Sequence, residues 1–169
     1  MKTVTLKFLR EELLDDIEKY SYVEGDVQRA DAEHLVHGKH QTQEMLQDDN
    51  IDLVTRHLDL ALARCREALY PYSKTPVADN VTADDILVEG TYYTIELNVP
   101  DDFSQTTVDW LEQLIHNLLV WWALYYWFSI TKPEAAEKWM TSANAAEEDI
   151  KGALARRCGR TRRPLRPFS

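Results

Sequence analysis

Polar side chains between residues 33 and 44 combine the residue types and the spacing that a divalent metal requires. They are Glu33, His34, His37, His40 and Glu44. Residues three or four apart share one face of a helix, and neutral imidazoles and carboxylates bind Zn²⁺ and similar ions. This cluster would suit a metal-dependent enzyme built on a helical bundle. The sequence lacks a His-Glu-x-x-His motif and a remote third ligand, so a solvated polar helix face is the favoured interpretation and no cofactor is predicted.

Other motifs that carry chemistry do not occur in the sequence. It has no Gly-x-Ser-x-Gly nucleophile motif, no dinucleotide-binding glycine pattern and no phosphate-binding loop. The adjacent aspartates 48–49, 84–85 and 101–102 lack the alternating ligand spacing of a calcium loop, which favours helix caps or turns. His57 and His116 occur singly within helical patterns, which predicts packed or hydrogen-bonded side chains. The chain is therefore expected not to be an enzyme.

The two cysteines do not form a recognisable redox or zinc motif. Cys65 and Cys158 are far apart, and neither belongs to a Cys-x-x-Cys pair. Cys65 lies on the apolar face of a predicted helix, which is typical of a small buried hydrophobic residue. Cys158 lies among arginines near the end of the chain and is interpreted as incidental.

The charges are unevenly distributed along the 169 residues. The net charge is −10, from 19 basic and 29 acidic residues. Residues 156–169 contain six arginines and no acidic residue, so residues 1–155 carry 13 basic and 29 acidic groups and a net charge of −16. An acidic body disfavours general nucleic-acid binding, because phosphates are neutralised by Lys and Arg. It leaves open an acidic regulatory protein that binds a basic partner.

The end of the chain is expected to be an extended basic arm over residues 159–169. Pro164 and Pro167 stiffen it, and it has no helical periodicity. Such an arm can lie on the acidic body of a neighbouring subunit. Its candidate contacts are four arginines and two apolar anchors: Arg160, Arg162, Arg163, Arg166, Leu165 and Phe168.

Aromatic residues are concentrated in one predicted helix over about 104–130. Residues 118–128 read LLVWWALYYWF, an apolar run that is too short for a membrane span, which needs roughly 20 residues. A helix that is apolar on every side must be buried on every side, either in a core or partly in a subunit interface. The sequence leaves both possibilities open. The candidate interface residues are Trp121, Trp122, Tyr125 and Tyr126.

The elements expected from periodicity define a mainly α fold in a single domain over residues 1–158. About five helices are predicted, near 7–22, 27–47, 51–69, 104–130 and 131–158, with a break at Gly25-Asp26. The last two form a long aromatic-rich helix hairpin in the C-terminal half, with Thr131 and Glu134 as a capping box. Strand patterns at 86–88 and 93–99 predict one small β-hairpin near 86–99. Alternation of Val4, Leu6 and Phe8 also allows an extended start to the chain.

Residues 86–169 carry a resemblance to a known class of proteins. The segment LVEGTYYTIELNVP, the Tyr/Trp-rich helix, the PEAAEKW helix and the ending RRPLRPF are similar to structural proteins of tailed bacteriophages and prophages. The layout resembles head–tail connector proteins, also called adaptor or neck proteins.

That resemblance implies an oligomeric virion structural protein without enzymatic activity. Such proteins form rings between portal and tail, present acidic residues to passing DNA without gripping it, and embrace neighbours with terminal arms. The expected partners are further copies of the chain, the portal and tail components, with no membrane. The expected location is the virion or the cytoplasm of the bacterial host, because the first residues lack the apolar run of a signal peptide.

Overall fold

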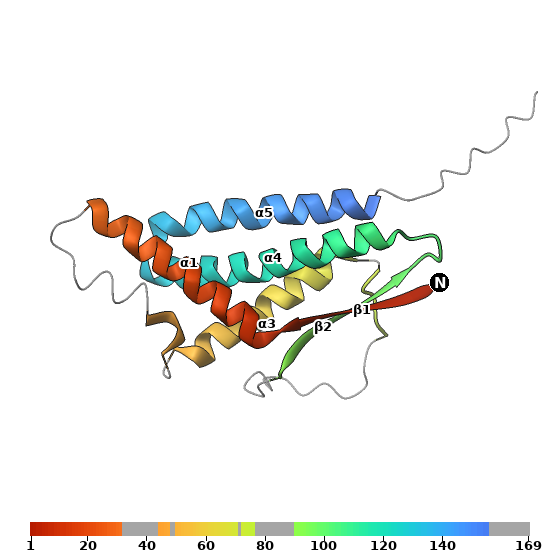
Figure 1. Ribbon diagram of the computed structural model, residues 1–169, viewed down its shortest axis with the longest axis horizontal. Helices are drawn as coiled ribbons and strands as arrows, with labels where there is room; N and C mark the ends of the chain where they lie inside the picture. The colour runs from red at the N-terminus through yellow and green to blue at the C-terminus, as the bar shows by residue number, and fades with distance from the viewer. Residues whose placement is uncertain (32–43, 48–49, 71, 77–89, 156–169) are drawn as a thin grey trace, which may run out of the picture.

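The computed structural model describes residues 1–31, 44–47, 50–70, 72–76 and 90–155. These residues form four α-helices, one short 3₁₀ turn and a two-stranded antiparallel sheet (Figure 1). In chain order the elements are β1 (Lys2–Leu9), α1 (Arg10–Asp31), η1 (Glu44–Leu46), α3 (Ile51–Ala68), β2 (Tyr92–Val99), α4 (Gln105–Thr131) and α5 (Pro133–Ala155). The prediction of a mainly α fold with a small β element is confirmed.

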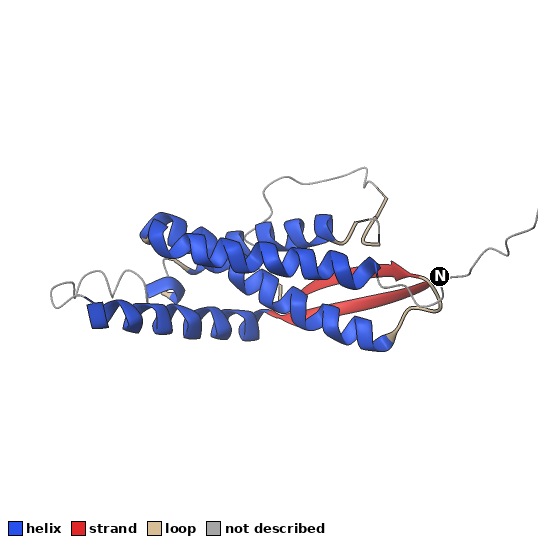
Figure 2. Ribbon diagram, turned by 90° about the horizontal axis from the view of Figure 1, so that it is seen from above, coloured by secondary structure: helices blue, strands red, loops and turns tan. Residues whose placement is uncertain are grey.

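Helices α4 and α5 form the predicted C-terminal hairpin, lying antiparallel along each other (Figures 1 and 2). The capping box predicted at the turn is wrong, because Thr131 is the last residue of α4 and its hydroxyl donates to the Trp127 carbonyl. Lys132 is the single residue between the helices, and its N–H donates to the Phe128 carbonyl. Pro133 then begins α5, where the missing N–H of proline costs nothing.

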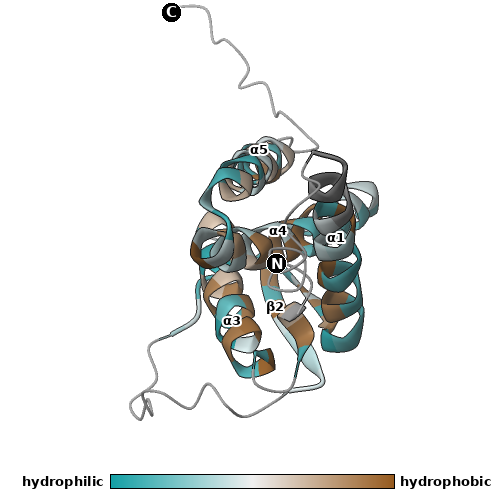
Figure 3. Ribbon diagram, turned by 90° about the vertical axis from the view of Figure 1, so that its left-hand side faces the viewer, coloured by the Kyte–Doolittle hydropathy of each residue, from teal (hydrophilic) through white to brown (hydrophobic). Residues whose placement is uncertain are grey.

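Helix α4 is the centre of the core, one of the two possibilities that its apolar sequence left open. It lies between α5, α3 and α1 (Figure 3). Its buried residues are Val108, Leu111, Leu114, Ile115, Leu118, Leu119, Val120, Trp122, Ala123, Leu124, Trp127 and Phe128. Among the described helices, none combines the length and apolar character needed to cross a bilayer.

Helix α3 matches its predicted amphipathic pattern closely. Its buried face contains Val54, Leu58, Leu62 and Cys65, spaced three or four residues apart. This face packs against α4. Because the pattern is local to one element, the sequence alone was sufficient to place it.

Helix α1 is longer than predicted and begins later. It runs through Gly25-Asp26, where the sequence predicted a break. Tertiary contacts support this stretch: the Tyr20 ring lies 5.4 Å from the Trp139 ring, and Lys138 Nζ is 3.2 Å from Glu24 Oε2. The helix cost of one glycine, about 1 kcal/mol, is of the same size as these contacts, which can offset it.

The predicted second helix over 27–47 is not a separate helix within the described residues. Its first five positions are the end of α1, and positions 44–46 form η1. Gln47 follows η1 outside any helix, and positions 32–43 lie outside the described residues. The described part therefore has four α-helices, one fewer than the five expected.

The β element pairs segments from opposite parts of the chain. β1 runs antiparallel to β2, with Leu6 opposite Ile95 and Phe8 opposite Tyr93. The predicted helix start at Lys7 is wrong, and the extended alternative for these residues is correct. The local β-hairpin near 86–99 is also corrected, because the partner of β2 is the N-terminal strand; positions 86–88 lie outside the described residues. Alternating apolar residues on both strands cover one side of the helical core.

Candidate functional site

The four aromatic interface candidates lie along one side of α4, and we call them the aromatic arc. The arc consists of Trp121, Trp122, Tyr125 and Tyr126, and each of these residues has another of them three or four positions away, so they share part of the helix circumference. Trp122 is only 2% exposed, whereas the other three side chains are half-buried. The structure thus places Trp122 in the core of this chain and leaves the exposed parts of the arc to its three neighbours.

Trp122 is held between two charged side chains from neighbouring helices. The Arg64 guanidinium carbon, from α3, lies 3.6 Å from the centroid of the Trp122 ring. On α5, Glu147 Oε1 accepts a hydrogen bond from the Trp122 indole N–H at 3.1 Å and lies 3.7 Å from Arg64 Nη2. A cation over a tryptophan face contributes about 0.5–2 kcal/mol. This clamp joins α3, α4 and α5 around one indole.

The two tyrosines of the arc pack against the clamped indole. The Tyr125 ring meets Trp122 edge-on, with centroids 5.3 Å apart and planes at 80°. The Tyr126 ring stacks on Trp122 at 5.8 Å and 26°, and it also lies 5.5 Å from the His57 ring. Because Trp122 is fixed by the clamp, the arc is a rigid aromatic surface, which is the kind that anchors protein contacts at low entropic cost.

Arg64 and Glu147 were not predicted as site residues. Both are charged residues on amphipathic helices, where solvent-facing positions are the usual interpretation. They lie on different helices, and no local spacing relates them to each other or to Trp122. Only the packing of α3 and α5 on α4 brings them together.

His57 is a packed side chain, as predicted. Its Nδ1 is buried and has no hydrogen-bond partner among the described residues. Burial lowers the pKa of His57 below its usual 6.5, because the charged imidazolium loses hydration. The native chain therefore favours neutral His57 against the Tyr126 ring.

Replacing His57 with glutamine is expected to flatten the acid side of the stability profile. Since the pKa of His57 is lower in the folded than in the unfolded chain, stability is retained above pH 6.5 and falls as the pH drops from 6.5 through the folded pKa. Between pH 7.5 and 5.5, urea unfolding should show a smaller fall for H57Q than for the wild type, by up to about 1 kcal/mol. His116→Gln on α4 is the control and should leave the His57-dependent fall in place. If the free energy of unfolding fell equally with pH in the wild type and in H57Q, His57 would not be the cause of the fall.

His116 is a hydrogen-bonded side chain, as predicted. Its Nε2 lies 2.8 Å from Asp16 Oδ2 and links α4 to α1. Within the described residues, no group of three or more His, Cys, Asp or Glu side chains could hold a metal ion. The candidate ligands Glu33, His34 and His37 lie outside those residues. Glu44 begins η1, and its side chain is also outside the description.

Cys65 is a buried thiol, as its position on the α3 stripe predicts. It is 0% exposed, and burial raises the pKa of the thiol to about 12. The nearby Glu147 carboxylate raises that pKa further, while Arg66 opposes it weakly. Since the thiolate is the reactive form, Cys65 packs as a small hydrophobic residue. Cys158 lies outside the described residues.

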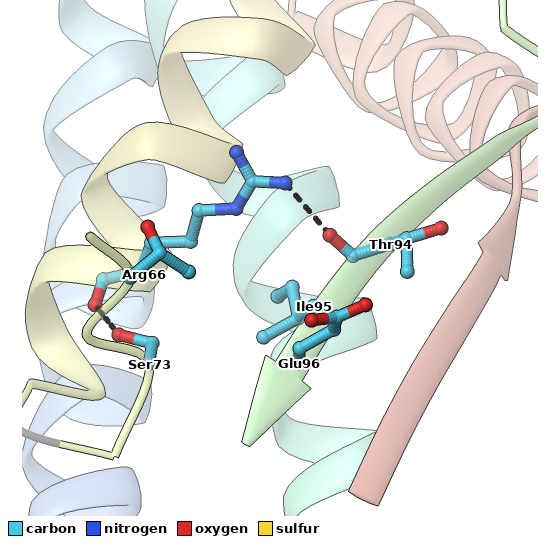
Figure 4. Close-up of a pocket in the computed structure, with 6 residues that line it drawn as sticks. Arg66, Ser73, Thr94, Ile95 and Glu96 are labelled. Carbon is cyan, nitrogen blue, oxygen red and sulfur yellow. Dashed lines mark hydrogen bonds between the residues drawn. The ribbon is translucent and has the colours of Figure 1, made fainter. Parts of the chain in front are cut away.

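A small open cleft separates the end of α3 from β2 (Figure 4). Its volume is about 310 Å³, and it is lined by Arg66, Ser73, Thr75, Thr94, Ile95 and Glu96. Arg66 Nη2 donates to the Thr94 carbonyl at 2.8 Å, and the Ser73 hydroxyl donates to the Arg66 carbonyl at 2.5 Å. These bonds join the segment after α3 to the outer edge of β2.

Acidic side chains cover the outside of the helices. Exposed carboxylates include Glu11, Glu12 and Asp15 on α1 and Glu148 and Asp149 on α5. The six candidate contacts of the basic arm, between residues 160 and 168, lie outside the described residues. The described body is thus the acidic part of the molecule.

Compared with protein-family models, curated proteins and solved structures, the chain has no match. Its function is therefore inferred from its own residues and contacts.

Proposed function

We propose that this chain is a non-enzymatic structural protein of a phage or prophage virion. In this role it belongs to the head–tail connector type and assembles into a ring or onto a portal. The single observation that carries the proposal is the rigid aromatic arc, which the clamp around Trp122 holds partly exposed on α4. The resemblance of residues 86–169 to connector proteins supplies the class of assembly.

The surface of α4 has the character of a protein contact. Trp121, Tyr125 and Tyr126 are half-buried, and Trp110 and Ile130 on the same helix are 50% and 66% exposed. Rigid aromatic side chains with an apolar body and a polar edge are enriched at binding hot spots. A neighbouring subunit or the portal would cover these residues.

The acidic exterior supports a role beside DNA without gripping it. Exposed carboxylates on α1 and α5 repel phosphates, so DNA would slide past such a surface. The basic arm has the opposite charge and would lie on the acidic body of a neighbour. In that contact, Arg160, Arg162 and Arg163 pair with carboxylates, together with Arg166, while Leu165 and Phe168 anchor the arm.

Removal of residues 159–169 tests the proposal in co-expression with the portal protein encoded nearby. Genes for portal, capsid and tail proteins are expected beside this one, and the wild-type chain is expected to co-purify with that portal. The truncated chain should keep its helical circular dichroism and lose at least about 90% of this binding, because the arm supplies the attractive charge. Tyr125→Asp on the arc should weaken the same binding.

Two control variants distinguish a specific loss of binding at the arm or the arc from a general effect of substitution on the protein. Replacing Arg160, Arg162, Arg163 and Arg166 with lysine keeps the charge and should retain most of the binding. Tyr70→Asp changes an exposed tyrosine just after α3 that is not part of the arc. Full binding by both the truncated chain and Y125D, or the absence of virion genes nearby, would refute the proposed function.

A further inference from the structure

The β1 strand has a free edge. The Arg10 N–H donates to the Thr91 carbonyl at 3.0 Å, which continues the ladder between β1 and β2. Hydrogen-bonded pairs alternate along an antiparallel ladder, so the even-numbered residues of β1 bond to β2. The N–H and C=O groups of Thr3, Thr5 and Lys7 therefore point away from β2. All three residues are exposed, and these backbone groups have no partner among the described residues.

The opposite edge of the sheet is closed by the chain itself. On β2, the Asn98 N–H donates to the Tyr72 carbonyl at 2.8 Å, and the Thr94 carbonyl accepts from Arg66. The backbone groups of Asn98 and Thr94 that form these bonds point away from β1, as expected if the odd-numbered residues of β2 bond to β1. Within the described residues, an added strand therefore meets bound backbone groups at β2 and unbound ones at β1.

We propose that β1 pairs antiparallel with β1 of a second copy of this chain, in the register that places Thr5 opposite the partner's Thr5. Thr3 then lies opposite the partner's Lys7, and Lys7 opposite the partner's Thr3. These three pairs use the free N–H and C=O groups of both strands. The product is a four-stranded sheet in the order β2, β1, β1 of the partner and β2 of the partner.

Charge disfavours the neighbouring symmetric register, the one centred on Lys7. Pairing centred on Lys7 would place two ammonium groups directly opposite each other, which is destabilising in a sheet. The register centred on Thr5 places each Lys7 opposite a threonine and each Lys2 opposite the partner's Phe8. Lysines on an edge strand commonly prevent unwanted strand pairing, but in this register Lys2 and Lys7 do not meet a like charge.

The helix-facing side of the sheet supports the same register. Val4 is only partly buried and packs at the margin of the core. In the Thr5-centred register, Val4 lies opposite the partner's Leu6 in a close, non-hydrogen-bonded pair. Apolar contact thus continues from one subunit to the other.

The second copy is favoured over a head-to-tail neighbour because of the closed β2 edge. A head-to-tail sheet would need β1 of one copy to join β2 of the next, which Tyr72 and Arg66 already occupy. Pairing of β1 with β1 displaces neither bond, and it closes as a two-fold dimer. This dimer is independent of the proposed function, since it uses neither the aromatic arc nor the basic arm.

Thr5→Pro tests this interface with little effect on the fold. Proline removes the Thr5 N–H, which faces the free edge, and leaves the bonds between β1 and β2 in place. Sedimentation equilibrium of the full chain should show the wild type moving from 19.7 kDa towards twice that mass as concentration rises. T5P should raise the dissociation constant by about 30-fold, because two backbone hydrogen bonds are lost. Thr5→Val keeps the N–H and should dimerise like the wild type.

Hydrogen exchange of the wild type gives a second measurement that needs no variant. The amides of Thr3, Thr5 and Lys7 should become protected as the dimer forms, while those of the closed β2 edge should not change. A wild type that remains at 19.7 kDa up to 200 µM, or dimerises while these three amides exchange freely, overturns the proposal. Protection of the three amides only by a different protein would likewise replace the second copy as the occupant of the edge.

Discussion

Replacing Trp122 with alanine is expected to lower the free energy of unfolding by about 3–5 kcal/mol, measured by urea unfolding. Trp122 is 2% exposed and packs against both tyrosines of the aromatic arc. The variant leaves a large cavity at the centre of the helical core. It also removes the ring under Arg64 and the indole N–H that donates to Glu147. Loss of packing and loss of the clamp therefore act in the same direction.

Two matched variants separate these contributions. Trp110→Ala changes a tryptophan of the same helix that is 50% exposed, and it should cost less than about 1 kcal/mol. Trp122→Phe keeps most of the packing and removes the bond to Glu147, so it should cost about 1–2 kcal/mol. Equal costs for W122A and W110A would contradict the central place of Trp122 in the core.

Replacing Phe8 with alanine is expected to have the second-largest effect, a loss of about 3–5 kcal/mol in the free energy of unfolding. Phe8 is 4% exposed, lies opposite Tyr93 in the sheet and has its ring 6.4 Å from the His116 ring on α4. Alanine would remove the Phe8 ring, which packs between β1 and α4 and covers this side of the core. Thermal or urea unfolding followed by circular dichroism measures the change.

The neighbouring Lys7 provides the control for Phe8. Lys7→Ala changes an exposed side chain on the opposite face of the same strand and should alter stability by less than about 0.5 kcal/mol. This alternation distinguishes a strand from the helix that the sequence predicted to start at Lys7. Similar small effects of F8A and K7A would show that β1 does not pack as described.

Helices whose apolar pattern is contained within their own sequence could be predicted well. The stripe through Val54, Leu58 and Cys65 placed α3 almost to its ends, and the apolar run at 118–128 identified α4 as a helix that must be largely covered. Periodicity was sufficient because each of these helices has one consistent apolar face or is apolar throughout.

The aromatic arc could be predicted only in part. Its four residues were recognisable as a cluster in one helix, but the sequence left core and interface open for all of them. Burial separates Trp122 from the other three, because Arg64 and Glu147 approach it from two other helices. Charged residues on different helices leave no local pattern that relates them.

The sequence by itself determined helices α3, α4 and α5, the apolar face of α3, and the division into an acidic body and a basic arm. The tertiary structure alone decided that β1 is a strand, that α1 continues through Gly25, and that Trp122 is clamped. The physical reason is the range of the interactions. Periodicity records how one element divides core from solvent, whereas strand pairing and helix continuation depend on contacts between residues far apart in the chain. Leu6 and Ile95, for example, lie opposite each other in the sheet although they are far apart in the sequence, and no local pattern relates them.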